Sequence, residues 1–229
     1  MIEENGRKRR LTAREVIFYL AISIVLNSFA NGLAVASNLG SAVWTASAVN
    51  LHGILPGSLG TILFTYAILV QVINLLIRWQ TVDWRAVFAN LLFAFLFSYL
   101  VQFWTHLLEY LGVTHLPWGL RLILDILGIG GIALATSIYQ RVDVMLHPND
   151  EFSYLIRFKF VHGSAAWGQY LSYVIPVVII GYCFGRTGHL LAVNIGTFFA
   201  LFCQGPIIGW ADQRIFPKLK HRLFLKSRS

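Results

Sequence analysis

Six stretches of about 20 mostly apolar residues, joined by short connections, constrain this chain more than any other feature of its sequence. A helix of that length crosses the hydrocarbon core of a bilayer, because each helical residue adds about 1.5 Å. The period-two alternation that a membrane β-barrel needs does not recur along the chain. We therefore predict an all-α membrane protein with six transmembrane helices. The expected spans are 16–36, 59–77, 86–107, 122–139, 165–184 and 190–210.

The composition supports this class. Charged residues make up 12% of the chain and hydrophobic residues 57%, whereas a soluble domain carries about 25% charged residues. So few charges exclude a water-soluble globule, a disordered chain and a secreted disulfide-stapled module. We expect a single membrane domain over 1–229, located as a multi-pass protein in the cell (plasma) membrane with the lipid bilayer around it.

The basic residues predict the orientation. A net charge of +8 is also compatible with nucleic-acid binding, so the position of the charges has to decide. With six helices, 16 of the 18 basic residues fall on one side of the membrane, and only Arg121 and Arg186 fall on the other. The positive-inside rule then places both termini in the cytoplasm. We expect no nucleic-acid partner, and we expect the basic tail at 211–229 to rest on anionic headgroups.

An internal repeat is indicated by three matches that occur in the same order in two parts of the chain. The first match lies in the second half of a span, the second lies just before a span, and the third lies within a span. The matches are 32–37 (GLAVAS) with 131–136 (GIALAT), Gly57-Ser58 with Gly163-Ser164, and Asn90 with Asn194.

These matches predict two three-helix units at about 15–110 and about 118–210. An odd number of helices per unit makes the second copy enter the membrane from the opposite side, which is the inverted-repeat plan of many transporters. The alternative is that helices packing through Gly and Ala resemble one another. The repeat also favours an uncleaved first helix over a signal peptide ending at 34–36 (AVA).

Two uncharged or amphiphilic segments follow the first and fourth spans, at 41–56 and 147–161. Each is too short to cross a bilayer. They are either re-entrant segments, which must line a cavity or lie against protein, or amphipathic segments at the headgroup level. The sequence does not decide between these two interpretations.

Catalytic and metal-binding signals are weak. Cys183 and Cys203 lie within spans, far from any metal-ligand spacing, and the seven histidines form no HExxH motif. Phosphate loops and GxSxG elbows are also missing from the sequence. We expect no enzyme activity, no metal and no cofactor.

One acidic residue lies clearly within a span. Asp125 is about one turn inside the expected fourth helix, where an ionised group costs about 2.5–3.5 kcal/mol. It is either a proton or cation relay or substrate anchor, or the i,i+4 partner of Arg121 at the membrane surface. Both interpretations stay open.

Amides at membrane depth indicate a polar cavity. Asn27, Asn31 and Asn38 share one face of the first helix. Such side chains bind polar solutes, although any single amide also stabilises helix packing, by about 0.6 kcal/mol on average. The preferred substrate-binding residues are Asn31, Asn38, Trp44, Asn90, Asp125, Asp150 and Asn194.

Several of these residues lie in motifs that resemble the YczE/YyaS/YitT-like family of bacterial multipass integral membrane proteins. That family has L-G-x-x-P-W-D after a Gly/Ala-rich helix end and a later G-x-P-x-D variant. Here 39–45 (LGSAVWT) keeps Leu, Gly and Trp but has Val43 and Thr45 in the places of Pro and Asp, and 147–150 (HPND) keeps Pro and Asp. The last span resembles the closing pattern of the family in 205–209 (GPIIG). The resemblance implies a multipass plasma-membrane protein, loosely called a permease, without an agreed substrate.

The leading hypothesis is a small transporter or permease in which a polar solute binds between the first and fourth helices and the two motif segments. The alternatives are a substrate-capturing subunit that needs an energising membrane-protein partner, and a scaffold or regulatory protein with no solute. A homo-oligomer is compatible with each of the three hypotheses.

Overall fold

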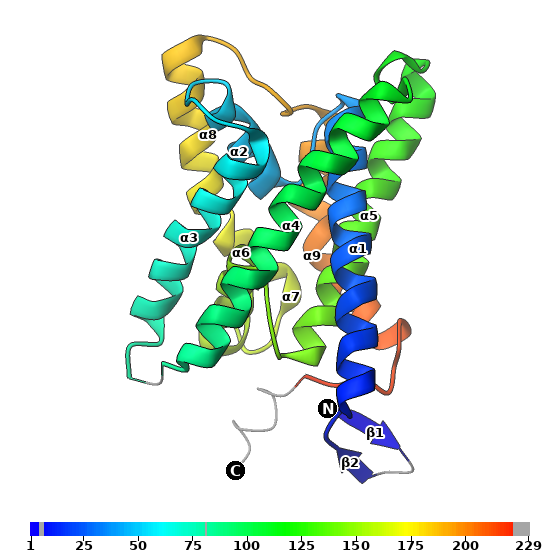
Figure 1. Ribbon diagram of the computed structural model, residues 1–229, viewed down its shortest axis with the longest axis vertical. Helices are drawn as coiled ribbons and strands as arrows, with labels where there is room; N and C mark the ends of the chain where they lie inside the picture. Colours follow the sequence, from blue (N-terminus) through cyan, green and yellow to red (C-terminus); the bar gives the residue numbers. More distant parts are fainter. Residues whose placement is uncertain (5–6, 81, 222–229) are drawn as a thin grey trace.

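The computed structural model describes residues 1–4, 7–80 and 82–221, and most of these are helical (Figure 1). Strands β1 (Ile2–Glu4) and β2 (Arg7–Arg9) form an antiparallel hairpin before the first helix. The helices are α1 (Ala13–Ser37), α2 (Val43–His52), α3 (Leu59–Ile77), α4 (Trp84–Tyr110), the short 3-10 helix η1 (Val113–His115), α5 (Trp118–Val142), α6 (Pro148–Lys159), α7 (Ala165–Ser172), α8 (Val174–Thr187) and α9 (Ile195–Arg214).

Five helical stretches in the described residues are long and apolar enough to cross a membrane: α1, α3, α4, α5 and the consecutive pair α7–α8. The prediction of an all-α, multi-pass membrane protein is confirmed at this level. The expected span at 190–210 begins too early, because α9 starts only at Ile195. This helix has 20 residues but is not among the five apolar stretches. Its glycines, together with Gln204 and Asp212, lower its mean hydropathy.

The expected span at 165–184 is two helices instead of one. Helix α7 ends at Ser172 and α8 begins at Val174, with Pro176 in its first turn. Proline is tolerated in a first turn, where the backbone N–H has no helical acceptor, but it interrupts a continuous helix. The break at Tyr173 is therefore a local consequence of Pro176.

A second proline lies inside α9 without ending the helix. Pro206 has no N–H to donate to the carbonyl of Phe202, four residues earlier. The hydroxyl of Tyr170 on α7 donates to that carbonyl instead, at 2.8 Å. The neighbouring helix thus satisfies the polar group that the proline leaves unpaired, as is common in membrane helices.

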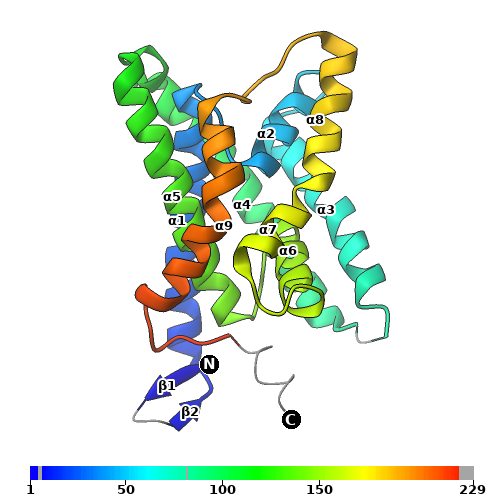
Figure 2. The ribbon, with the colours of Figure 1, turned by 180° about the vertical axis from the view of Figure 1, so that it is seen from behind.

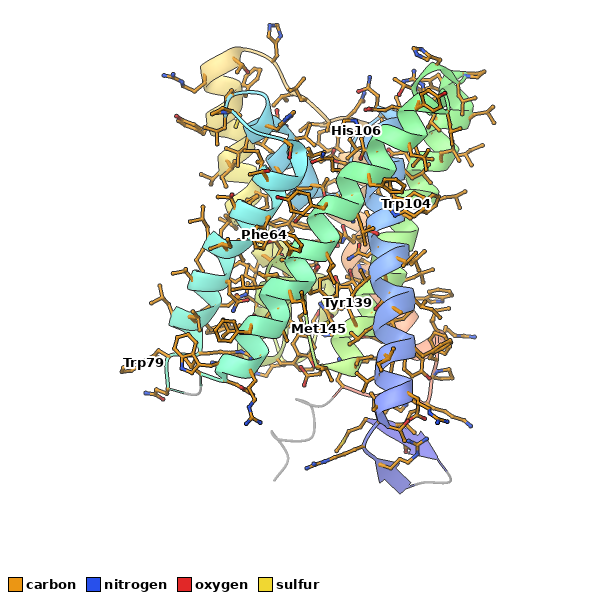
Figure 3. All side chains as sticks on the ribbon, in the orientation of Figure 1. Phe64, Trp79, Trp104, His106, Tyr139 and Met145 are labelled. Carbon is orange, nitrogen blue, oxygen red and sulfur yellow. The ribbon has the colours of Figure 1, made fainter. Side chains whose placement is uncertain are left out.

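The outside of the bundle is apolar, and its interior combines apolar side chains with many polar ones. Trp79 at its edge is 73% exposed, whereas Tyr139 lies between the helices and is fully buried (Figure 3). A soluble protein does not expose so many large apolar side chains. An apolar exterior suits a lipid environment. The buried polar residues include Asn27, Asn31, Gln71, Asn74, Asn90, Asp125, Gln140 and Gln204.

Helices α1 and α5 pack along each other on one side of the bundle, as Figures 1 and 2 show from opposite sides. Helix α4 lies against α1, and α9 lies against α5. Helix α3 packs on α4, and α7 packs on α9. The short helices α2 and α6 fill the remaining positions: α2 packs on α3 and α8, and α6 packs on α3 and α7.

Glycines permit the close contacts of α1 with its neighbours. A Cβ atom on Gly128 of α5 would lie 2.9 Å from the carbonyl oxygen of Ala30 on α1. A Cβ atom on Gly32 would lie 2.6 Å from the Cβ atom of Trp104 on α4. Small residues let helix backbones approach where lipid supplies no hydrophobic driving force. The 32–37 and 131–136 matches in the sequence thus lie at or beside real helix contacts.

Helix ends repeat along the chain. The helix α1 ends at Asn38 and α5 at Asp143, and both residues adopt the left-handed conformation, with φ of 54° and 53°. Ser58 caps α3 by accepting from the Thr61 N–H, and Ser164 caps α7 by accepting from the Trp167 N–H. Each serine follows a glycine with positive φ. The Gly-Ser pairs are therefore helix-start signals with the same geometry.

The N-terminal hairpin and the described segment after α9, up to residue 221, lie at one end of the bundle, which we call the terminus-side end (Figure 1). The N–H of Glu3 donates to Lys218 O at 2.8 Å, and the N–H of Lys220 donates to Met1 O at 2.8 Å. The segment after α9 thus pairs with the N-terminal hairpin.

The two short helices are buried among the long ones. In α2 the buried residues run from Val43 to Ala48, and in α6 they include Pro148, Asn149 and Glu151. Most residues of both helices are buried, although Figure 2 shows α6 at the front of the view beside α7. This placement meets the requirement that non-spanning backbone at membrane depth lies against protein.

Candidate functional site

A small cavity lies deep in the bundle, where α2 and α6 begin. Its volume is about 30 Å³, enough for about two water molecules. The first turns of α2 and α6 form two of its walls, through Trp44 and Thr45 on one side and Asn149 and Asp150 on the other. Helices α1, α3, α4, α5 and α9 complete the lining.

Hydrogen bonds to α1 position the start of α2. The hydroxyl of Thr45 donates to Asn31 Oδ1 at 2.6 Å, and Asn31 Nδ2 donates to Asn27 Oδ1 at 2.9 Å. The indole ring of Trp44 packs against Tyr66, with ring centroids 5.5 Å apart. The face of α1 that carries the two asparagines therefore turns toward the cavity, and it orients α2.

The start of α6 is held by its own cap and by α5. His147 is the N-cap residue, and its Nδ1 accepts from the N–H of Asn149 at 3.3 Å. In the neutral ring, an accepting Nδ1 requires the hydrogen to be on Nε2. Asp150 accepts a short hydrogen bond from the hydroxyl of Tyr139, and Asn27 Nδ2 donates to the same hydroxyl at 3.3 Å.

Three buried polar atoms that belong to cavity-lining residues have no hydrogen-bond partner among the described residues. They are Nε1 of Trp44, Nε2 of His147 and Oδ1 of Asn149. The three residues are only 6%, 3% and 7% exposed. A buried polar group without a partner costs about 1–3 kcal/mol, so such groups in a native protein indicate water or a ligand. The cavity is thus built to receive polar atoms.

A second polar cluster lies beside the cavity and anchors α6. The carboxylate of Glu151 accepts from Asn74 at 3.1 Å and from Asn90 at 2.8 Å. Arg78 forms an ion pair with the same carboxylate at 3.2 Å. Asn90 Oδ1 in turn accepts from the N–H of Leu146 at 2.8 Å. These contacts connect α3, α4 and α6, and their buried groups are largely satisfied within the cluster.

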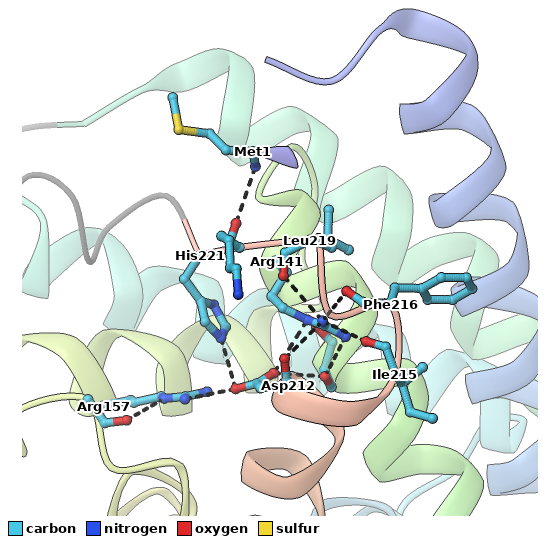
Figure 4. Close-up of polar contacts among 11 residues, drawn as sticks. Met1, Arg141, Arg157, Asp212, Ile215, Phe216, Leu219 and His221 are labelled. Atoms are coloured by element: carbon cyan, nitrogen blue, oxygen red, sulfur yellow. Dashed lines mark hydrogen bonds and ion pairs between the residues drawn. The ribbon is translucent and has the colours of Figure 1, made fainter. Parts of the chain in front are cut away.

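A third cluster closes the terminus-side end (Figure 4). Arg141 is fully buried and donates to the carbonyls of Ile215 and Phe216 at 2.8 and 3.1 Å. Asp212 accepts from Arg157 at 2.8 Å and contacts His221 Nε2 at 2.9 Å. The cluster fastens the segment after α9 to the bundle.

Burial determines the charge state of the histidine in this cluster. It lowers the pKa of His221 below its ordinary value, although Asp212 acts in the opposite direction. The ring is then neutral at pH 7, and Nε2–H donates to the carboxylate.

Asp125 lies outside these clusters, fully buried between α1, α5 and α9. A Cβ atom on Gly196 would lie 1.7 Å from its Oδ2, so α9 can approach only because position 196 has no side chain. Arg121 donates to Ser37 O at 3.2 Å, and the described ion pairs do not include one between Arg121 and Asp125. The neighbouring Ser37 hydroxyl donates to Ala34 O at 2.7 Å.

The structure brings together three of the seven residues proposed from sequence, namely Asn31, Trp44 and Asp150, which line the cavity. The other four lie elsewhere. They are Asn38, an exposed C-cap of α1; Asn90, in the Glu151 cluster; Asp125, against Gly196; and Asn194, the exposed N-cap of α9.

Five polar residues of the cavity were not among those chosen from sequence: Asn27, Thr45, His147, Asn149 and Gln204. His147 and Asn149 belong to the HPND motif, so their position beside Asp150 in the sequence could have identified them as cavity residues. Thr45 occupies the place of an expected Asp and still donates a hydrogen bond. Gln204 had no signal, since only packing brings α9 to the cavity; its Oε1 accepts from Tyr173 at 2.9 Å.

The described residues contain no group of three or more His, Cys, Asp or Glu side chains arranged to hold a metal ion. A family model described as "Family of unknown function (DUF6198)" matches residues 13–213. No curated protein and no solved structure matches the chain significantly.

Proposed function

The chain belongs to the DUF6198 family of unknown function, and we propose that it is a small transporter that moves a polar solute across the cell membrane. The observation that carries this proposal is the cavity between α2 and α6, with three buried polar atoms that have no partner among the described residues. In many transporters, discontinuous helices begin near the membrane midplane, and their N-termini face the solute. Helices α2 and α6 have this arrangement.

The proposal includes two inverted three-helix halves at about 15–110 and about 118–210. Asn38 and Asp143 end the first long helix of each half, and Ala42 and His147 precede the short helices. The number of residues from Asn38 to Ala42 is the same as the number from Asp143 to His147. The packing of the helices also maps onto itself when α1 is exchanged with α5, α2 with α6, α3 with α7–α8 and α4 with α9.

A reciprocal pair of hydrogen bonds supports the same symmetry. The N–H of Ser41, just before α2, donates to Thr197 on α9 at 3.1 Å. The N–H of Leu146, just before α6, donates to Asn90 on α4 at 2.8 Å. In each half, the turn before the short helix therefore bonds to the last long helix of the other half. Thr197 is thus a better counterpart of Asn90 than the N-cap residue Asn194.

Six crossings are proposed because the N-terminal hairpin and the segment after α9 share one end of the bundle, which requires an even number. Helix α9 supplies the sixth, since its 20 residues extend over about 30 Å. The terminus-side end carries most basic residues of the chain, which favours the cytoplasm by the positive-inside rule. The resemblance to the YczE/YyaS/YitT-like family is compatible with this topology and stays a prediction.

Hydrogen bonds join the two halves on both sides of the cavity. Toward the end opposite the termini, the N–H of Leu191 donates to Asn50 Oδ1 of α2 at 2.9 Å. Toward the terminus-side end, Lys159 of α6 donates to the carbonyl of Ile77 at 3.0 Å. Alternating access requires one set of contacts to open while the other holds, by rocking of one half against the other.

The test is solute uptake by the purified full chain in proteoliposomes, over a panel of small polar metabolites. Cysteines at Asn50 and Leu191, in a chain with Cys183 and Cys203 replaced by alanine, allow one end to be locked with a reducible crosslinker. We expect crosslinking to abolish uptake and reduction to restore it. Undiminished uptake in the locked protein would contradict alternating access, and a complete lack of uptake would favour the subunit or scaffold hypotheses.

A further inference from the structure

The two helix N-termini at the cavity differ chemically. In α6, Pro148 has no N–H, and the N–H groups of Asn149 and Asp150 donate to Nδ1 and the carbonyl of His147. In α2, the N-cap residue is Ala42, which has no side chain to accept a hydrogen bond. The N–H groups of Val43 and the two residues after it donate to no described residue. Only the start of α2 therefore presents free backbone donors.

The donors at the start of α2 are joined by two side-chain donors. The indole N–H of Trp44 lines the cavity without an acceptor among the described residues. Nε2–H of His147 is in the same situation, because Nδ1 of that ring accepts from Asn149. A helix N-terminus carries a partial positive charge of about +0.5. Together these groups form a binding site for an anionic group, such as a carboxylate.

The opposite wall of the cavity attracts positive charge. The side-chain partner of Asp150 is the neutral hydroxyl of Tyr139, and the described ion pairs include none with this carboxylate. Asp150 is half-buried, and it lines the cavity. Oδ1 of Asn149 beside it is an acceptor without a donor. A carboxylate without an ion pair and a free acceptor together suit an ammonium group.

We infer that the ligand of this cavity is a small zwitterion whose carboxylate binds at the start of α2 and whose ammonium group binds at Asp150 and Asn149. This inference takes from the proposed function only that the cavity is the solute site. A zwitterion brings both charges at once, so that neither the ligand nor Asp150 buries an uncompensated charge. A volume of about 30 Å³ favours the smallest zwitterions, such as glycine, and the walls have to move apart to admit its five non-hydrogen atoms.

Four compounds with the same number of non-hydrogen atoms test the inference on the purified full chain in detergent. Glycine carries both charges, glycinamide only the ammonium, glycolate only the carboxylate, and glycolamide neither. We expect glycine at about a hundred times its Kd to raise Tm by about 5–10 °C. Glycinamide and glycolate should bind at least about tenfold more weakly, and glycolamide should have no effect.

Two variants assign the two ends. Trp44→Phe keeps an aromatic ring but removes the N–H, so it should weaken glycine and glycolate to a similar degree and leave glycinamide unchanged. Asp150→Asn removes the charge that attracts ammonium and repels carboxylate, so glycolate should now bind at least as well as glycine. The matched control is Trp79→Phe at the exposed edge of the bundle, which should change none of these responses. The comparison is made between shifts within each variant, so a variant that is merely less stable still gives a result.

Equal responses to glycine and glycolamide would overturn the inference, and so would the lack of any response to glycine. The outcomes separate it from the transport proposal. Binding of glycine in the expected order without uptake in proteoliposomes would contradict transport and leave the zwitterion site standing. Uptake of a solute of another charge class, abolished by the cavity variants, would contradict the zwitterion and leave transport standing.

Discussion

The short helices α2 and α6 begin at the same cavity but are held in different ways. Helix α6 has its own cap in His147, and the charged Glu151 anchors it to α3 and α4. At the corresponding place α2 has Ala46, and its N-cap residue Ala42 gives no side-chain bond. The charged side chain of Glu151 thus anchors α6, whereas the backbone N–H groups at the start of α2 have no acceptor among the described residues. Two helices in similar backbone positions can therefore have different roles. Helix α6 holds the geometry of the cavity, and α2 presents groups that can bind a ligand.

The largest expected effect is the loss of the α6 anchor. Glu151→Ala leaves Arg78 without its carboxylate and two buried amides without their acceptor. Breaking a buried pair costs about 3–5 kcal/mol, and since Arg78 is partly exposed we expect about 3 kcal/mol. Denaturant unfolding of the purified protein measures this change, with Glu109→Ala on the exposed part of α4 as control. A loss below about 1 kcal/mol would show that α6 does not depend on this anchor.

The next largest effect is expected at Asp150, the third residue of α6. Tyr139→Phe removes the hydroxyl that donates to Asp150. Because the acceptor is a carboxylate, we expect a loss of about 1.5–3 kcal/mol. The measurement is again unfolding in detergent. Tyr110→Phe, on a tyrosine that is 88% exposed, should have no effect. An equal loss in both variants would mean that the Tyr139–Asp150 bond contributes nothing specific.

Giving α2 the cap that it lacks should have opposite effects on stability and binding. Ala42→Ser supplies a side-chain acceptor for the free N–H groups at the start of α2. We expect the ligand-free protein to gain about 0.5–1 kcal/mol and its response to glycine to weaken several-fold, because the serine competes for the same donors. The control is Ala42→Gly, which changes the size of the residue without adding an acceptor. A stabilised protein with unchanged glycine binding would separate the helix start from the ligand site.

The smallest effect is expected at the α2 counterpart of Asp150. Thr45→Val removes a neutral hydroxyl that donates to Asn31 at 2.6 Å. Interhelical bonds of this kind are worth about 0.6 kcal/mol on average in membranes, so the loss should be clearly smaller than for Tyr139→Phe. Thr45→Ser, which keeps the hydroxyl, serves as control. A loss as large as that of Tyr139→Phe would remove the contrast between the two helices.

Much of the fold was predictable because its signals are local. The apolar stretches at 59–77 and 86–107 follow from the length that a bilayer requires, and they lie within α3 and α4. The start of α9 was missed because Asn194, not hydropathy, begins the helix. Pro176 is a local signal for a break in the span at 165–184, but the exact position of the break at Tyr173 becomes visible only once the helix ends are known.

The candidate site was predictable in part. Trp44 and Asp150 were found because aromatic and acidic residues stand out in segments too short to span. Gln204 and Thr45 were missed because nothing in their neighbourhood distinguishes a cavity-lining polar residue from one that pairs with an adjacent helix. Asp125 is the opposite case. It stands out in the sequence as an acidic residue within a span, but the structure places it against Gly196 and away from the cavity.

The sequence by itself determined that this chain is a helical membrane protein, since a low content of charges and long apolar runs leave no other way to satisfy the backbone. It also determined the helix-start signals at Ser58 and Ser164, which act within one turn. Only the tertiary structure decided which polar atoms meet. Unpaired donors and acceptors become meaningful only when all their neighbours are known, and the neighbours of Trp44 and His147 come from helices far apart in the chain.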